Sequence, residues 1–252
     1  MRENLLKTKW ASGDWTLNGW LQIPSSVSAE LMAHAGWDSL TVDLQHGLVD
    51  YTTAIPMLQA LSTTSVVPLA RVPWNEPGII MKLLDAGCYG IICPMINTRE
   101  QAESFVRSCK YPPLGERSWG PHRAQLYAGS GYREHANENL LALAMIETRE
   151  ALDNLDAILS TPGLDGCYIG PSDLGLSLGY EPKPDREEPE LLEAIDRILA
   201  TAKRHNVQAI MHCGSTAYAK RMIAKGFDGV TVLADSLFLR QGATQVVGEM
   251  KS

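Results

Sequence analysis

Short apolar runs and segments with helical periodicity alternate along the whole chain, and no block of consecutive strands interrupts the alternation. We predict eight strands, at residues 17–23, 39–45, 66–72, 90–96, 140–146, 164–169, 207–213 and 227–233. We predict helices at 28–35, 51–61, 76–86, 98–109, 149–159, 189–205 and 217–224, with a last helix at the carboxyl end. Parallel neighbours need a crossover connection, so this order indicates parallel pairing. Eight repeats, with no GxGxxG motif after the first strand, favour a single α/β (β/α)8 TIM barrel over residues 1–252 rather than an open doubly wound sheet.

Two connections are longer or more polar than the rest. Residues 110–139 show little periodicity, and loops of this length in a compact domain are usually functional or disordered. Two interpretations are open: the loop covers an anionic substrate, or it is a surface excursion that buries Trp119 and Tyr127. The basic side chains that favour the first interpretation are Arg117, His122, Arg123 and Arg133. The polar segment 180–188 is predicted to be a solvated turn.

Composition and charge narrow the range of partners. The net charge is −7, and phosphate contacts need a basic face, so we expect no nucleic-acid partner and no polybasic membrane contact. The amino terminus has no apolar signal core, and no window reaches the roughly 18 apolar residues of a membrane span, so we expect a cytoplasmic protein. The five cysteines form no CxxC pair and fit reduced core residues better than a thiol nucleophile or a metal site. They are Cys88, Cys93, Cys109, Cys167 and Cys213.

The most informative polar residues are two carboxylates that directly follow apolar runs. Glu147 follows the fifth predicted strand and Asp173 follows the sixth, so both belong to the catalytic end of the barrel. Two neighbouring anions repel each other unless a cation or a shared proton lies between them. Oxygen ligands of this kind suit Mg2+ or Mn2+, with water and substrate completing the coordination. The plain alternatives are that Glu147 pairs with Arg149 and that Asp173 caps the helix that follows.

A histidine and an arginine extend this set to other strand ends. His46 lies three residues after Asp43, and a carboxylate bonded to the imidazole would suit a general acid/base. Arg71 ends the third strand, where its guanidinium needs an anionic ligand or a salt bridge to Glu147 or Asp43. His212, near the end of the seventh strand, fits a packed core position better than the rim.

The remaining strand ends supply the predicted substrate contacts, and the positions of the lysines bear on whether a covalent Schiff base could form. The predicted substrate contacts are Trp20, Gly170, Pro171, Ser172 and Asp173. Schiff-base chemistry needs a desolvated lysine on a barrel strand, and all nine lysines fall in predicted helices, loops or termini. We therefore predict no Schiff-base lysine and no organic cofactor, and favour an enolate stabilised by a divalent metal ion.

Several motifs together resemble the HpcH/HpaI family of class II, metal-dependent pyruvate aldolases. The resemblance covers residues 17–232, nearly the whole chain. It is carried by GWLQIPSSVSAELMAHAGWDSLTVDLQH, KLLDAG, YGIICPMINT, YPPLGERSWGP, MIETREALDNLDAI and DGCYIGPSDLGLSLG. The resemblance implies Mg2+, Mn2+ or Co2+ held by Glu147 and Asp173, and backbone contacts from Ser172 and Asp173 to the keto acid. It also implies an enolate stabilised by Arg71 and proton transfer by His46 supported by Asp43. An aspartate matching Asp85 would act across a subunit interface in a homohexamer.

Two positions depart from the family pattern. Gln45 stands where many relatives have glutamate, which removes a negative charge beside His46. Met145 stands where some relatives have glutamine, which removes one polar contact. We expect a carbon–carbon lyase that catalyses reversible aldol addition between pyruvate or hydroxypyruvate and an aldehyde. The alternatives are a citryl- or malyl-CoA-type lyase and, with less support, a non-catalytic barrel that binds keto acids.

Overall fold

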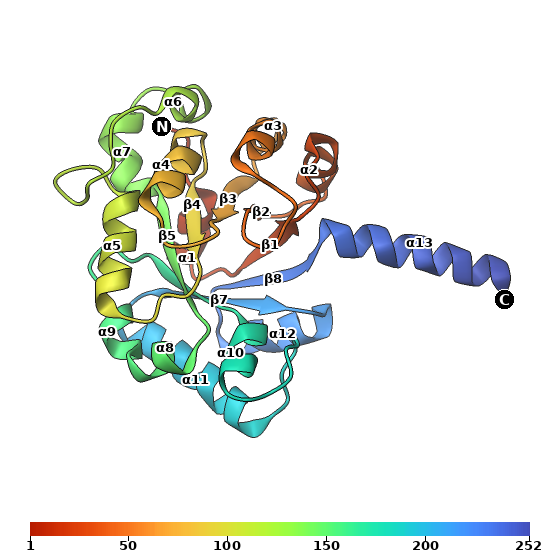
Figure 1. The fold of residues 1–252 in the computed structure, drawn as a ribbon. Coiled ribbons are helices and arrows are strands. Elements are labelled where there is room, and N and C mark those ends of the chain that lie inside the picture. Colours follow the sequence, from red (N-terminus) through yellow and green to blue (C-terminus); the bar gives the residue numbers. More distant parts are fainter.

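Eight parallel strands close into one barrel, with each strand paired to its neighbours in sequence and β1 paired to β8. The computed structural model describes residues 1–252 and shows the helices as an outer ring around these strands (Figure 1). The strands are β1 Thr16–Leu21, β2 Ser39–Asp43, β3 Val67–Arg71, β4 Gly90–Cys93, β5 Leu141–Ile146, β6 Gly166–Ile169, β7 Gln208–Cys213 and β8 Gly229–Ala234. Their residues are almost all buried, as expected of strands covered on both faces. The predicted (β/α)8 barrel is confirmed.

The helices follow the predicted order. Four helices that were not predicted lie before β1, in the 110–139 connection and directly after β6. They are α1 Leu5–Ala11, α2 Ser26–Ala33, α3 Tyr51–Leu61, α4 Pro77–Asp85, α5 Arg99–Cys109, α6 His122–Ala128, α7 Tyr132–Asn139, α8 Arg149–Asp153, α9 Leu155–Leu159, α10 Pro171–Ser177, α11 Pro189–Arg204, α12 Thr216–Lys225 and α13 Asp235–Lys251. The predicted helix at 149–159 is divided at Asn154 into α8 and α9. None of the helices is long and apolar enough to cross a membrane.

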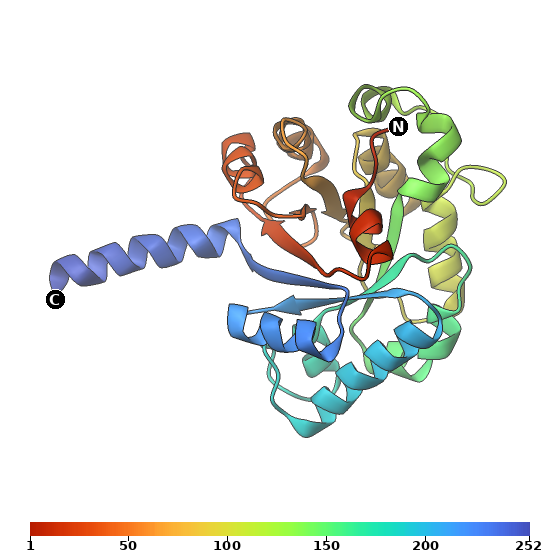
Figure 2. The same cartoon turned by 180° about the vertical axis from the view of Figure 1, so that it is seen from behind.

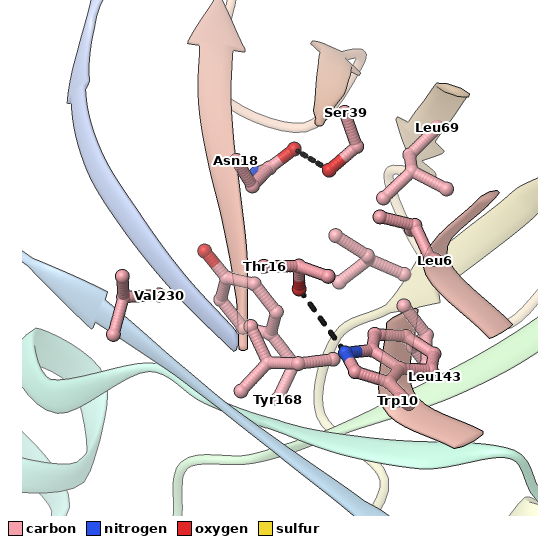
Figure 3. Close-up of a pocket in the computed structure, with 11 residues that line it drawn as sticks. Leu6, Trp10, Thr16, Asn18, Ser39, Leu69, Leu143, Tyr168 and Val230 are labelled. Carbon is pink, nitrogen blue, oxygen red and sulfur yellow. Dashed lines mark hydrogen bonds between the residues drawn. The ribbon is translucent and has the colours of Figure 1, made fainter. Parts of the chain in front are cut away.

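Helix α1, which the sequence pattern did not predict, closes the amino-terminal end of the barrel. Leu6 is buried, and the Trp10 indole nitrogen donates to the Thr16 hydroxyl at 3.1 Å (Figure 3). The space left inside this end is about 10 Å3, roughly the room of one water molecule. The amino-terminal end is therefore a packed floor, which leaves the opposite mouth for ligands.

Half of the connection at 110–139 is helical, so the prediction of an irregular stretch was wrong for that half. It contains α6 and α7, and Arg123 donates to the backbone oxygens of Ala86 and Leu58, which fixes α6 to the outside of the barrel. Tyr127 is partly buried, whereas Trp119 keeps 50% of its surface exposed. The segment is an ordered surface excursion and does not line the cavity at the mouth.

The segment at 180–188 also differs from its prediction as a solvated turn. Arg186 is fully buried, and its Nε donates to the backbone oxygen of Pro171 at 3.1 Å. A side chain at Gly175 would overlap this guanidinium, because an added Cβ would lie 1.5 Å from Nη2. The segment therefore packs against α10 and holds its first turn in place.

The five cysteines are all buried and free, as predicted. Burial raises the pKa of the Cys88, Cys109 and Cys167 thiols to about 12. Such thiols are protonated near neutral pH and are poor nucleophiles. They act as small core residues.

Candidate active site

A cavity of about 170 Å3 lies at the mouth of the barrel, where the carboxyl ends of the strands meet. Its residues come from the ends of β1, β3, β5, β6 and β7 and from the turns after β1, β2 and β6. It is lined by Trp20, Gln22, His46, Arg71, Met145, Tyr168, Gly170, Pro171, Ser172, Asp173 and His212. All five predicted substrate contacts are in this set. No lysine lines it.

One side of the mouth is built on a buried ion pair between Asp43 and Arg71. The two residues end β2 and β3 and lie directly opposite each other in the parallel register. Arg71 donates from Nε and Nη2 to the two Asp43 oxygens, at 2.9 and 2.7 Å. The Trp20 indole nitrogen donates to the same carboxylate at 2.9 Å. Burial alone would raise the pKa of Asp43, but the hydrogen bonds and charge of Arg71 hold it below its usual value.

His46 is exposed at the rim of the cavity, on the turn that follows β2. Asp43 accepts a hydrogen bond from the backbone N–H of His46 at 3.3 Å and does not contact the imidazole. The prediction of a carboxylate–imidazole bond was therefore wrong, because Arg71 and Trp20 already occupy the Asp43 oxygens. The imidazole has no hydrogen bond within the protein and is free to meet a substrate.

Glu147 stands on the other side of the mouth, one residue after β5, with 2% of its surface exposed. Its Oε1 accepts a hydrogen bond from the backbone N–H of Met95 at 2.9 Å, and its Oε2 has no partner in the protein. Met95 has a φ of 55°, an uncommon value for a residue with a side chain, and this conformation presents its N–H to Glu147. Burial, aided by the charge of Asp173, raises the pKa of Glu147 to about 7, against the opposing effects of the Met95 hydrogen bond and the charge of Arg71.

The turn after β6 brings Asp173 to the same side. Gly170 precedes α10, and an added Cβ there would lie 2.3 Å from Oε2 of Glu147, so glycine is required to make room for that carboxylate. Asp173 is exposed in the first turn of α10, and its side chain forms no cap or other hydrogen bond. The amides of Ser172 and Asp173 also have no acceptor in the protein. The helix-cap alternative for Asp173 is excluded.

These two carboxylates fit a hard cation and do not fit a pair of ordinary salt bridges. Arg71 is engaged with Asp43, and Arg149 lies 3.8 Å from Glu190, so neither arginine pairs with Glu147. No group of three or more His, Cys, Asp or Glu side chains gathers anywhere in the structure. A cation held here would therefore take most of its ligands from water and substrate, as Mg2+ and Mn2+ commonly do.

Two lining residues were missed or misjudged from the sequence. The Tyr168 hydroxyl on β6 lies 2.8 Å from Nδ1 of His212 on β7, and the Trp20 ring meets the imidazole edge-on at 5.3 Å. His212 thus lines the cavity, whereas the sequence favoured a packed core position. Tyr168 was not singled out, although it precedes Gly170 by two residues and so points to the same side of its strand.

Asp85 lies outside the cavity of its own chain. It ends α4, and its carboxylate accepts a hydrogen bond from Nη2 of the buried Arg117 at 2.6 Å. Arg117 in turn lies over the Tyr111 ring and contacts the Tyr132 hydroxyl, so the pair belongs to the packing of the 110–139 excursion. Any role for Asp85 at a cavity requires a second subunit.

Comparison with known proteins agrees with this architecture. The chain is 43% identical to a hydroxypyruvate/pyruvate aldolase from Rhizorhabdus wittichii, over 99% of both chains. It is 36% identical to a 5-keto-4-deoxy-D-glucarate aldolase from Shigella dysenteriae, over 98% of this chain and 96% of that one. A crystal structure of a family protein from Burkholderia cenocepacia J2315 superimposes with a TM-score of 0.91 at 29% identity, covering 99% of this chain and all of that one. Residues 19–237 match the family described as HpcH/HpaI aldolase/citrate lyase, and the chain belongs to that family.

Proposed function

We propose that this protein is a metal-dependent aldolase that joins pyruvate or hydroxypyruvate to an aldehyde and catalyses the reverse cleavage. The observation that carries the proposal is the pair of carboxylates without a basic partner, Glu147 and Asp173, beside a cavity of about 170 Å3. That volume is below the roughly 300–1,000 Å3 of pockets for drug-sized ligands and suits small substrates. The two relatives named as aldolases support the same reaction class.

Glu147 and Asp173 would hold the divalent ion, for which we propose Mg2+, Mn2+ or Co2+. When bound, such an ion would offset the two negative charges and stabilise charge that develops on a keto oxygen. Glu147 is suited to this role because Met95 fixes one carboxylate oxygen and Gly170 leaves room beside the other. The free amides of Ser172 and Asp173 would bind the carboxylate of the keto acid, as first-turn amides of helices bind anions.

Arg71 would stabilise the enolate oxygen. Its Nε and Nη2 are held by Asp43, which leaves Nη1 without a hydrogen bond in the protein. Asp43 fixes the plane of the guanidinium, so Nη1 is held ready to meet the enolate oxygen. Binding therefore costs less side-chain conformational entropy than it would with a mobile arginine.

His46 would move the proton. In cleavage, a base removes the proton of the substrate's 4-hydroxyl, the bond between carbons 3 and 4 breaks, and the electron pair passes into the enolate of the keto acid. Protonation of carbon 3 then completes the reaction. An imidazole at the rim with no bond to the protein is placed to accept the first proton from a substrate.

Proton exchange at carbon 3 of pyruvate tests this proposal directly. With magnesium, the protein in deuterated water is expected to exchange these protons, as followed by NMR. Exchange should fall about 100–1,000-fold after EDTA treatment or in the Glu147→Gln variant, since the loss of one electrostatic contact to developing charge typically has an effect of this size. Readdition of Mg2+, Mn2+ and Co2+ ranks the metals. Full exchange in the EDTA-treated protein would refute the mechanism.

We also propose that the protein is a homo-oligomer, with a hexamer as the expected form. Helix α13 extends away from its own barrel (Figures 1 and 2), and its outer turns carry Val246, Val247 and Met250 at 50–80% exposure. Large apolar side chains that gather on a projecting helix mark a contact with another protein surface, here a second copy. Sedimentation should show an oligomer that Met250→Asp combined with Val246→Asp weakens. A monomeric wild-type protein would exclude the proposal and any role for Asp85 across an interface.

A further inference from the structure

His212 and its neighbour Tyr168 are the two titratable side chains of the cavity that the proposed mechanism does not use. His212 lies on β7, next to the strand that leads into Gly170 and α10, and its ring contacts Trp20. Its Nδ1 is 2.8 Å from the Tyr168 hydroxyl. Its Nε2 has no hydrogen-bond partner in the protein and is not enclosed by it. The imidazole therefore offers one nitrogen to whatever fills the cavity.

A chain of buried hydrogen bonds fixes the imidazole from behind. The Tyr168 hydroxyl is also 2.8 Å from Oγ1 of Thr231, which accepts a hydrogen bond from the Asn18 side-chain amide at 2.9 Å. The Asn18 oxygen accepts a hydrogen bond from the Ser39 hydroxyl (Figure 3). It accepts a second one from the Thr41 hydroxyl. These bonds tie four strands of the barrel together. Rotation of the imidazole would break the Tyr168 contact and leave buried groups unpaired, which is costly.

The same surroundings keep the imidazole neutral. Burial and, to a smaller extent, the positive charge of Arg71 lower the pKa of His212 to about 4, against a smaller opposite effect of Asp43. A neutral imidazole has one donor and one acceptor nitrogen. With Nδ1 engaged, Nε2 is a single donor or a single acceptor. A hydroxyl satisfies either case, because it both donates and accepts, whereas a carboxylate only accepts and fits only the tautomer that carries its proton on Nε2.

We propose that Nε2 of His212 binds a hydroxyl on the carbon next to the reacting carbonyl of a substrate, and that Tyr168 is the positioning residue for this contact. Two substrates can supply such a hydroxyl: the donor, as in hydroxypyruvate compared with pyruvate, or the acceptor, as in glycolaldehyde compared with acetaldehyde. The proposal rests on the proposed aldolase function. It adds a specificity-determining contact that is separate from the carboxylates, Arg71 and His46.

The test compares substrates that differ only by this hydroxyl. Calorimetry with magnesium present gives the affinities for hydroxypyruvate and pyruvate, and steady-state kinetics gives kcat/KM for glycolaldehyde and acetaldehyde. In His212→Phe the preference for the hydroxylated member of one pair should fall about tenfold or more, since a buried polar partner is lost. Tyr168→Phe should lower the same preference about threefold, because it frees the imidazole while keeping a ring. His212→Gln, which keeps a hydrogen-bonding group, should lie between wild type and His212→Phe.

The ratio of two substrates separates a specific contact from general damage. A variant that is merely misfolded or loosened loses both members of a pair together and leaves the ratio unchanged. Unchanged ratios in both pairs, in folded His212→Phe protein, would overturn the proposal. If the wild type binds keto acids but catalyses neither exchange nor addition, the aldolase function fails, and the calorimetric ratio alone then decides for or against His212.

Discussion

The two sides of the barrel mouth treat their buried carboxylates in opposite ways. At the ends of β2 and β3, both oxygens of Asp43 accept hydrogen bonds from Arg71, and the pKa of Asp43 lies below its usual value. At the ends of β5 and β6, Glu147 has one backbone donor, no ion pair and a second carboxylate nearby, and burial raises its pKa to about 7 although the charge of Arg71 opposes the rise. The barrel thus neutralises Asp43 with a buried salt bridge and leaves Glu147 without one.

This difference shows where the protein needs a ligand. A buried charge without a partner is unfavourable, and natural proteins retain one chiefly where function requires it. The strained Met95 and the obligatory Gly170 both serve Glu147, so the local backbone is arranged around the unpaired site. The paired side, by contrast, needs nothing further and holds Arg71 rigid.

The largest effect should come from replacing each acid by its amide. Asp43→Asn is expected to lower the free energy of unfolding by about 3–5 kcal/mol, because it leaves the charge of Arg71 buried without its counterion. Glu147→Gln should instead raise the stability of the metal-free protein at pH 8 by roughly 1–3 kcal/mol. A glutamate whose folded pKa lies above its unfolded value is stabilising below the unfolded pKa and loses that contribution as pH rises through about 7. Glutamine mimics the protonated form and keeps the contribution.

Urea unfolding of both variants and wild type, after EDTA treatment, measures these changes. Opposite signs would confirm that the two sides differ as described. Equal destabilisation by the two substitutions would mean that Glu147 has a favourable partner in the metal-free protein, and would remove the argument for a cation.

Gly170→Ala should have a smaller effect on the Glu147 side of the mouth. The added Cβ would lie 2.3 Å from Oε2 of Glu147, so the carboxylate must move. We expect the affinity for Mn2+, measured by calorimetry, to fall about 10–100-fold, the usual cost of disturbing the support of a metal ligand. Gly242→Ala is the matched control, because no atom lies within 4 Å of its added Cβ. Equal affinities in the two variants would show that Glu147 does not face the ion.

The sequence predicted the barrel and most of the mouth because their signals are local. Each strand is a short apolar run, and Glu147 and Asp173 follow their runs directly, so a strand boundary was enough to bring them together. Whether Arg71 pairs with Asp43 or with Glu147 could not be predicted from the local sequence. It depends on the register that sets Asp43 opposite Arg71, and on Trp20 from a third strand.

The parts that the sequence did not predict depend on tertiary packing. Helix α7 buries only Tyr132 and Ala136, so its apolar pattern is too weak to separate it from a loop. Arg186 looked solvated because it lies in a polar segment, yet the missing side chain of Gly175 creates the space that buries it. Tyr168 was indistinguishable from a core residue, because only the fold shows that its hydroxyl meets His212.

The smallest predicted effect tests whether burial at the paired side of the mouth, aided by the charge of Arg71, keeps the His212 imidazole neutral. His212 faces Arg71, Asp43 and Tyr168, and burial and Arg71 lower its pKa to about 4. The unfolded chain then binds more protons below its own pKa of about 6.5, so the contribution of His212 to stability is present above 6.5 and is lost as pH falls towards 4. Between pH 6.5 and 5.5, wild type should therefore lose on the order of 1 kcal/mol more stability than His212→Gln, as measured by urea unfolding at the two pH values. Identical losses would show that the imidazole charges freely in the folded protein, and that neither burial nor Arg71 lowers its pKa.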